Sequence, residues 1–208
     1  MEATISNNKA FISVGLFKTL VFVLCLLPIF NLVWSGFQQQ LGANPAETII
    51  RSLGDWALYF VLLTLAVTPL RRVFNWTILL RVRRMLGLFV FFYACLHLIG
   101  YVWFDHFFDW NEILKDIIKR PFITLGFATF LLLLPLALTS TNKMMKRLKK
   151  NWKKLHQLVY PISVMATLHY FWMIKADFRQ PALVAFILAL LLGYRIYVYV
   201  QSQKKSRA

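Results

Sequence analysis

The sequence predicts an all-α integral membrane protein, a single domain over residues 1–208 that forms a six-helix transmembrane bundle. Of its 208 residues, 59% are hydrophobic and only 15% are charged, whereas soluble domains carry roughly a quarter charged residues. Long apolar stretches alternate with short basic runs, and about 20 apolar residues are enough for a helix to cross a bilayer. With two cysteines in the chain, a disulfide-stapled secreted module is excluded.

Six stretches are expected to cross the membrane. The first, over residues 11–34, contains one charge, Lys18, whose long side chain can reach toward the helix end. The second, over residues 54–70, is the weakest candidate because only 15 uncharged residues precede Arg71. The last, over residues 180–200, contains Arg195, which can reach the interface in the same way. The three stretches between them carry no charge and cover residues 85–104, 121–142 and 155–174.

The positions of lysine and arginine predict the orientation. Six crossings place both chain ends on one side, together with the loops 71–84 and 143–154, and 18 of the 24 basic residues fall on that side. Because basic loops remain in the cytoplasm, both termini are expected to be cytoplasmic. The run 143–154 is expected to lie on anionic membrane lipid, and no nucleic-acid partner is expected. The residues 139–141, Thr-Ser-Thr, are expected to cap a short interfacial helix there.

Two histidines in the apolar stretches are candidate metal ligands. His97 lies 13 residues beyond Arg84, and His169 lies 15 residues beyond Lys154. Both helices run outward, so a rise of about 20 Å places both imidazoles at similar depth in the outer half of the membrane. Histidines at one level on separate helices can ligate a heme iron from both faces. Interhelical hydrogen bonding is the alternative role for each histidine.

Small and aromatic residues near these histidines are expected to surround the heme. Alanine and glycine leave room for the flat macrocycle, and tyrosine either lines the pocket or packs elsewhere. The chain contains no Cys-x-x-Cys-His sequence, so the heme is expected to be b-type, held without covalent attachment. The expected lining residues are Tyr93, Ala94, Gly100, Tyr101 and Ala166.

His156, near the cytoplasmic face, is a candidate for a second redox site. On a straight helix it lies about 140° around the axis from His169, unless Pro161 bends the helix. A second heme would need a ligand near positions 83 and 84, where the chain has Arg83 and Arg84. Arginines do not ligate iron, but they pair with heme propionates or a flavin phosphate. The residues therefore favour one bis-histidine heme, and a docking site for a second redox group around His156.

Short segments between about residues 41 and 175 resemble the MsrQ (YedZ) family, heme-binding membrane subunits of bacterial periplasmic methionine sulfoxide reductase systems. This family belongs to the ferric reductase-like transmembrane group, which includes the NADPH oxidase membrane domain. The segments that carry the resemblance are Leu41-Gly-Ala-Asn-Pro45, Thr68-Pro-Leu-Arg71, Arg81-Val-Arg-Arg-Met-Leu-Gly-Leu88, Leu96-His97, Arg120-Pro121, Leu125-Gly126, Leu138-Thr-Ser-Thr141, Trp152-Lys-Lys-Leu-His156 and His169-Tyr170.

The resemblance implies a b-type heme, an associated FMN, and location in the bacterial inner membrane. It also implies electrons that come from the quinone pool and pass to a periplasmic molybdopterin-containing catalytic subunit, the partner in a heterodimer, which repairs oxidised proteins. The family's histidines correspond to His97, His156 and His169. NADPH oxidases hold two stacked hemes with a histidine pair on each of two helices, and this chain departs from that pattern because residues 85–104 contain only one histidine.

Two alternative functions remain at this point. A stand-alone ferric reductase or oxidase-type cytochrome b would pass electrons directly to chelated iron or oxygen, and it would need a donor domain that this sequence lacks. A non-redox scaffold or transporter would use the histidines only to join helices, and the purified protein would be colourless. In the favoured interpretation the chain moves electrons and performs no substrate chemistry of its own.

Overall fold

The structure, a computed structural model, describes residues 2–174 and 177–207, and side chains within 14–174 and 177–204. All regular elements of the described residues are helices. In chain order they are α1 (Glu2–Phe37), α2 (Pro45–Phe74), the 3₁₀ turn η1 (Thr77–Arg81), α3 (Arg83–Gly100), the π-helical turn η2 (Tyr101–Asp105), α4 (Trp110–Lys119), α5 (Pro121–Leu138), α6 (Asn142–Leu148), α7 (Lys150–Leu155), the 3₁₀ turn η3 (His156–Leu158), α8 (Val159–Met173) and α9 (Arg179–Arg207).

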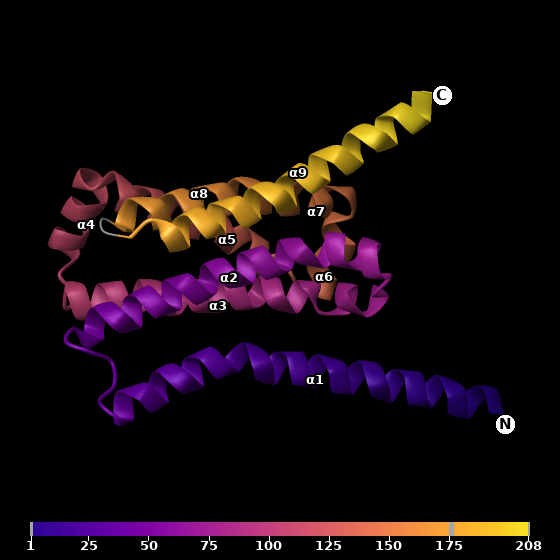
Figure 1. Cartoon of the computed structure of the whole chain (residues 1–208), viewed down its shortest axis with the longest axis horizontal. Helices are drawn as coiled ribbons and strands as arrows, with labels where there is room; N and C mark the ends of the chain where they lie inside the picture. Colours follow the sequence, from indigo (N-terminus) through magenta and orange to yellow (C-terminus); the bar gives the residue numbers. More distant parts are fainter. Residues whose placement is uncertain (1, 175–176, 208) are drawn as a thin grey trace.

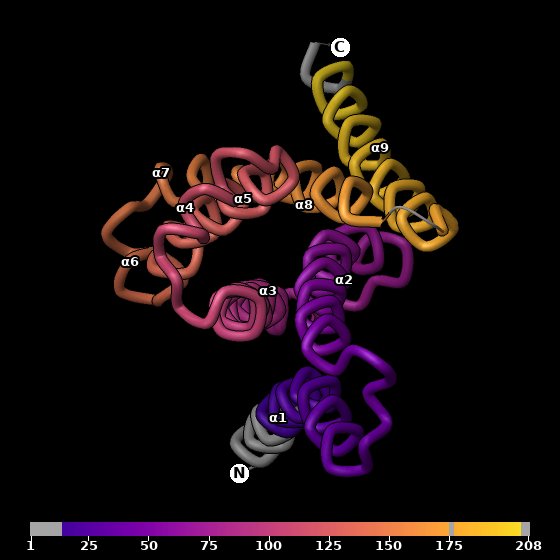
Figure 2. Tube along the Cα trace, turned by 90° about the vertical axis from the view of Figure 1, so that its left-hand side faces the viewer, coloured from indigo at the N-terminus to yellow at the C-terminus, as the bar shows by residue number. Residues whose placement is uncertain are grey.

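The long helices form a bundle in which α2, α3, α5 and α8 surround the interior. α2 packs along α3, α5 packs along α8, and α9 lies against both α8 and α2. α1 packs on the side of α2 and α3 that faces away from α5 and α8, as Figure 2 shows. The N-terminal end of α1 and the C-terminal end of α9 lie at the same end of the bundle as α6 and α7, whereas α4 lies at the other end (Figure 1).

The structure shows a membrane protein with several apolar spans. Within the described residues, five helices are long and apolar enough to cross a membrane: Val14–Phe37, Pro45–Phe74, Arg83–Asp105, Pro121–Leu138 and Arg179–Lys204. The remaining expected span, over residues 155–174, corresponds to α8, which has only 15 residues. Pro161 lies in its first turn, where the missing N–H is tolerated, and the chain just before it forms the tighter turn η3.

The second helix is longer than the sequence predicts. The expected range was 54–70, but α2 covers Pro45–Phe74. The Asn44 side chain caps its first turn by accepting a hydrogen bond from the Glu47 N–H, at 3.3 Å. Glu47 then pairs with Arg51 one turn later, at 2.5 Å, which stabilises the charged first turns as a helix. Glu47 and Arg51, whose charges suggested that the helix begins later, therefore lie inside α2.

The cap predicted for the basic loop is confirmed. α5 ends at Leu138 rather than at residue 142, and the Thr141 hydroxyl accepts a hydrogen bond from the Met144 N–H, at 3.2 Å. This bond begins α6, and α7 follows it directly. The short helices turn the chain back toward α8 at the end of the bundle where basic residues gather.

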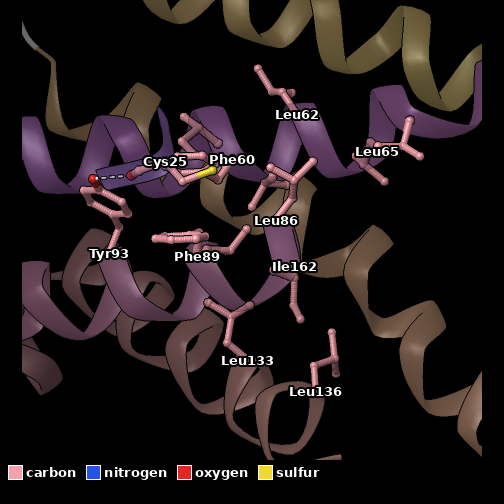
Figure 3. Close-up of a cluster of buried hydrophobic side chains, with 14 of the residues drawn as sticks. Cys25, Phe60, Leu62, Leu65, Leu86, Phe89, Tyr93, Leu133, Leu136 and Ile162 are labelled. Carbon is pink, nitrogen blue, oxygen red and sulfur yellow. Dashed lines mark hydrogen bonds between the residues drawn. The ribbon is translucent and has the colours of Figure 1, made fainter. Parts of the chain in front are cut away.

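An aromatic core joins the first three helices (Figure 3). Phe60 of α2 stacks on Phe89 and on Tyr93 of α3, with ring centroids 5.7 and 5.2 Å apart. The Tyr93 hydroxyl donates a hydrogen bond to the Cys25 carbonyl of α1, at 2.8 Å. The outer faces of α1 and α9 expose large apolar side chains such as Phe30 and Leu190. Helices that are apolar all round are typical of a bundle in lipid.

Candidate functional site

His97 of α3 and His169 of α8 lie side by side in the interior. Their ring centroids are 6.3 Å apart, and the ring planes are inclined by 78°. Both side chains line a cavity of about 1150 Å³ whose wall includes residues of α2, α3, α5 and α8. The structure therefore brings together the two histidines that the sequence places at one depth.

Each imidazole donates a hydrogen bond to a backbone carbonyl of the helix beside it. Nδ1 of His97 lies 2.8 Å from the Ile50 oxygen of α2, and Nδ1 of His169 lies 2.7 Å from the Phe122 oxygen of α5. A carbonyl oxygen can only accept, so Nδ1 carries the hydrogen and Nε2 keeps its lone pair. Metal-ligating histidines are usually held in this way, with the second nitrogen bonded to a carbonyl or carboxylate.

The spacing of the two rings fits axial ligation of a metal. A metal–nitrogen bond of about 2 Å and a ring radius of about 1.1 Å place two opposed imidazole centroids about 6 Å apart. The observed centroid distance is 6.3 Å. Within the described residues, no three His, Cys, Asp or Glu side chains cluster as a metal site. Two histidines across an apolar cavity therefore fit a metal in a planar macrocycle, such as heme, better than an all-protein site.

Three of the five expected lining residues border this cavity. Ala94 of α3, Tyr101 of η2 and Ala166 of α8 line it. Tyr93 and Gly100 do not. Tyr93 is fully buried in the aromatic core, where its hydroxyl is bonded to α1. Gly100 faces the Ile50 side chain, which a Cβ at this position would meet at 3.2 Å.

Two glycines that sequence reasoning passed over support the histidines. A Cβ on Gly54 would lie 3.0 Å from Cε1 and Nδ1 of His97. A Cβ on Gly126 would lie 2.8 Å from Cε1 of His169. Gly126 belongs to the family-like segment Leu125-Gly126, but the sequence assigned it no role. The sequence feature that could have indicated this role is a glycine within an apolar helix, because small residues allow close approach between helices.

A polar network borders the cavity beside α4. The Asp116 carboxylate of α4 lies 3.2 Å from Nε2 of His106 and 3.2 Å from Nε of Arg120. The Tyr101 hydroxyl is 3.5 Å from the same carboxylate. His106 lies in a turn between helices, yet its side chain is only 13% exposed, because it packs between Asp116 and the Tyr101 ring.

His156 lies apart from the histidine pair, near the end of the bundle that carries α6 and α7. Its Nε2 is 3.1 Å from Oγ1 of Thr139, and its ring stacks on Trp152 with centroids 4.0 Å apart. Arg83 is half-buried and lies within electrostatic range of His156. Arg84 is exposed and donates to Oδ1 of Asn142, at 2.5 Å. Of the two arginines, Arg83 and not Arg84 is thus within electrostatic range of His156.

Arg195, which the sequence treats only as a charge near a helix end, lies inside this region. It donates to the Tyr160 hydroxyl of α8 and to the Leu65 carbonyl of α2, each at 2.9 Å. Arg83 lies within electrostatic range of both Arg195 and Tyr160. Among the described residues, neither arginine forms a salt bridge with a carboxylate. This basic group is suited to an anion.

Comparisons with known proteins identify the family. Residues 53–167, more than half of the chain, match the family model described as ferric reductase like transmembrane component. A protein of Herminiimonas arsenicoxydans is 55% identical over 93% of this chain and 90% of its own length. Relatives from Rhodospirillum rubrum and Xanthomonas euvesicatoria are 52% and 49% identical, each over 90% of this chain and 91% and 88% of their own lengths. All three are named protein-methionine-sulfoxide reductase heme-binding subunit MsrQ.

The chain belongs to the MsrQ family. The matched ferric reductase-like segment begins in α2 and ends in α8, so it includes His97, both supporting glycines and His156. His169 lies two residues beyond its end. The similarity to the MsrQ relatives extends over nearly the whole chain.

Proposed function

We propose that this chain is the heme-binding electron-transfer subunit of a protein-methionine-sulfoxide reductase system. The observation that carries the proposal is the pair His97 and His169, whose ring centroids are 6.3 Å apart and whose Nδ1 atoms are both bonded to carbonyls. The names of the MsrQ relatives, which include the words heme-binding subunit, support it.

In this proposal, His97 and His169 would hold heme b through their Nε2 atoms. The heme would supply one-electron transfer, and two histidine ligands would leave no open position for oxygen. Arg51 and Arg120 border the same cavity and would pair with the heme propionates. The apolar walls, including Ala94, exclude water from the site.

The proposal includes a topology of six crossings, with α8 as the sixth and both termini in the cytoplasm of a bacterial inner membrane. The excess of basic residues on one side supports it, as does the position of the two chain ends at one end of the bundle (Figure 1). Electrons from the quinone pool would enter at this end. They would leave at the outer end to a periplasmic molybdopterin-containing catalytic subunit, with which the chain forms a heterodimer.

We further propose that the basic group near the cytoplasmic end holds a second redox group. Arg83 and Arg195 carry no carboxylate partner among the described residues, and they lie near His156 and Tyr160. Paired guanidinium groups bind phosphate and carboxylate. Either the phosphate of FMN or the propionates of a second heme would satisfy them, so the site fits the flavin that the family resemblance implies.

Absorption spectroscopy tests the heme assignment. Detergent-purified protein from heme-replete cells is compared with His97→Ala and His169→Ala in reduced-minus-oxidised spectra, with size-exclusion profiles to verify folding. We expect a b-type spectrum in the parent and its loss in both variants. A colourless parent protein would overturn the proposal and favour a non-redox scaffold or transporter.

A ferric reductase is the second candidate, and the family match described as ferric reductase like favours it. Stopped-flow reoxidation separates the two functions. The pre-reduced protein is mixed either with ferric citrate or with a periplasmic methionine sulfoxide reductase subunit and oxidised substrate. Fast reoxidation by the subunit and slow reoxidation by ferric citrate support the electron-transfer role, and the reverse order supports direct ferric reduction.

A further inference from the structure

We propose that Gly54 and Gly126 are positioning residues for the two histidines. Each leaves space for an imidazole Nδ1–H to reach a helix carbonyl, and so helps to set the rotation of that ring. This inference rests on the proposed function, because the rings it orients are those that would bind the heme iron. Nothing in the family match or in the names of the relatives assigns a role to either glycine.

The geometry in α2 explains why glycine is needed. In an α-helix, the carbonyl of residue i accepts the N–H of residue i+4, so the Ile50 oxygen is already paired with Gly54. Its second lone pair accepts from Nδ1 of His97, at 2.8 Å. The imidazole edge then lies directly over position 54, where a Cβ would be 3.0 Å from both Cε1 and Nδ1. Nine in ten real Cβ contacts are longer than this, so any other residue requires the ring to move by a few tenths of an ångström.

The same arrangement occurs independently in α5. Nδ1 of His169 is 2.7 Å from the Phe122 oxygen, and Gly126 lies one turn beyond that carbonyl. A Cβ on Gly126 would meet Cε1 at 2.8 Å and Nδ1 at 2.9 Å, closer than at the first site. The two histidines each lie 47 residues beyond their accepting carbonyl. Two helix pairs therefore hold two imidazoles by one geometric rule.

The other helical glycines of the described residues do not share this contact. A Cβ on Gly87 or Gly193 would meet nothing within 4 Å. A Cβ on Gly100 would meet Cγ1 of Ile50 at 3.2 Å, so it would crowd the interface between α2 and α3 without touching an imidazole. Close glycine–imidazole packing thus coincides with the two proposed ligands.

The consequence is control over the imidazole planes and their donor strength. The two anchors hold the rings inclined by 78°. Nearly perpendicular axial imidazoles give low-spin ferric heme a strongly anisotropic electron paramagnetic resonance (EPR) signal, whereas parallel rings give a rhombic one. The hydrogen bond from Nδ1 also raises the basicity of the ligand. Loss of either anchor would rotate one ring and weaken its bond to the metal.

The test uses Gly54→Ala and Gly126→Ala in the full-length protein, with Gly87→Ala and Gly193→Ala as controls, because a Cβ at either control position meets nothing within 4 Å. Three quantities are measured: heme affinity by titration of the heme-free protein, the EPR spectrum of the ferric form, and the midpoint potential. We expect both test variants to lose about 10-fold or more in heme affinity, with a changed EPR signal and a raised midpoint potential. Both controls are expected to match the parent.

A double-mutant comparison separates positioning from misfolding. In the His97→Ala background, Gly54→Ala has no ring to displace, so the heme-free proteins with and without Gly54→Ala are expected to unfold at the same temperature. A lower unfolding temperature in that background would overturn the positioning role. So would test variants that match the parent, or a Gly193→Ala protein that changes as they do. A parent without a bis-imidazole spectrum would instead overturn the proposed function.

Discussion

Nε2 of His156 donates a hydrogen bond to Oγ1 of Thr139, at 3.1 Å. The direction follows from the Thr139 hydroxyl, which donates its own hydrogen to the Pro135 carbonyl at 2.6 Å and so must accept from the imidazole. His97 and His169 have the opposite arrangement, with Nδ1 as donor. Nε2, which among the described residues accepts and donates no hydrogen bond in His97 and His169, is therefore occupied in His156.

We predict that His156→Ala retains the b-type absorbance that His97→Ala and His169→Ala lose. The His156 ring is held by Thr139 and Trp152 and does not line the cavity. Heme content per protein in purified membranes is the measurement. A loss of heme in His156→Ala as complete as in His97→Ala would show that this histidine also serves the site between His97 and His169.

We predict that Tyr93→Phe weakens the attachment of α1 to the bundle. The variant loses the hydrogen bond from Tyr93 to the Cys25 carbonyl but keeps the aromatic stacking, at a cost of about 1 kcal/mol. Thermal unfolding in detergent measures the change. Tyr59→Phe is the control, because the Tyr59 hydroxyl has no hydrogen-bond partner within the described residues. Equal unfolding temperatures for the two variants would contradict the prediction.

We predict that Asp116→Asn loosens the end of the cavity beside α4. Its carboxylate pairs with both His106 and Arg120 and is only 13% exposed, so removing its charge weakens two contacts at once. Hydrogen exchange of residues 101–120, followed by mass spectrometry, is expected to become faster. Glu112→Gln is the control, since its ion pair with Lys115 is more than half exposed and such pairs contribute little. Identical exchange in both variants would rule out the structural role of Asp116.

We predict that Arg195→Met destabilises the junction of α2, α8 and α9. Arg195 bonds to the Tyr160 hydroxyl and to the Leu65 carbonyl, and hydrogen bonds to a charged group contribute about 1.5–3 kcal/mol each. A lower unfolding temperature in detergent is the expected result. Arg72→Met, at an exposed position near the end of α2, is the control. The prediction fails if both variants unfold alike.

We predict that Arg51→Gln and Arg120→Gln each lower the heme midpoint potential. Both arginines border the cavity, and a nearby positive charge favours the reduced form of the iron, which carries one charge less. A shift on the order of tens of millivolts is expected from Coulomb interaction at such range. Potentiometric titration measures it, with Arg72→Gln at the opposite end of the bundle as control. An unchanged or raised potential would remove these arginines from the heme site.

Most of the architecture was predictable from the distribution of apolar residues. A helix that crosses a bilayer must be apolar over about 20 residues, whatever it packs against. The predicted helix bounds were wrong where local interactions decide at which residue a helix begins. Residues 45–53 were expected to lie outside a helix because of their charges, but the Asn44 cap and the pair Glu47–Arg51 make them helical. The expected span 155–174 begins later, at Val159, because η3 precedes Pro161.

The candidate site was also predictable only in part. Helical rise is enough to place His97 and His169 at one depth, because it depends only on residue number. Which side chains surround them depends on helix rotation, and for this reason Tyr93 and Gly100 were expected in the cavity but lie elsewhere. Arg195 was assigned to the interface from its position near a helix end, although it bonds inside the bundle.

The sequence by itself determined that the chain is a membrane helix bundle with two histidines at equal depth, and its short segments pointed to the family. Only the tertiary structure showed that each imidazole rests on a glycine and bonds to a carbonyl 47 residues earlier. The physical reason is that hydropathy and rise along a helix are properties of one segment, whereas a ring's orientation depends on which backbone atoms of a neighbouring helix it meets.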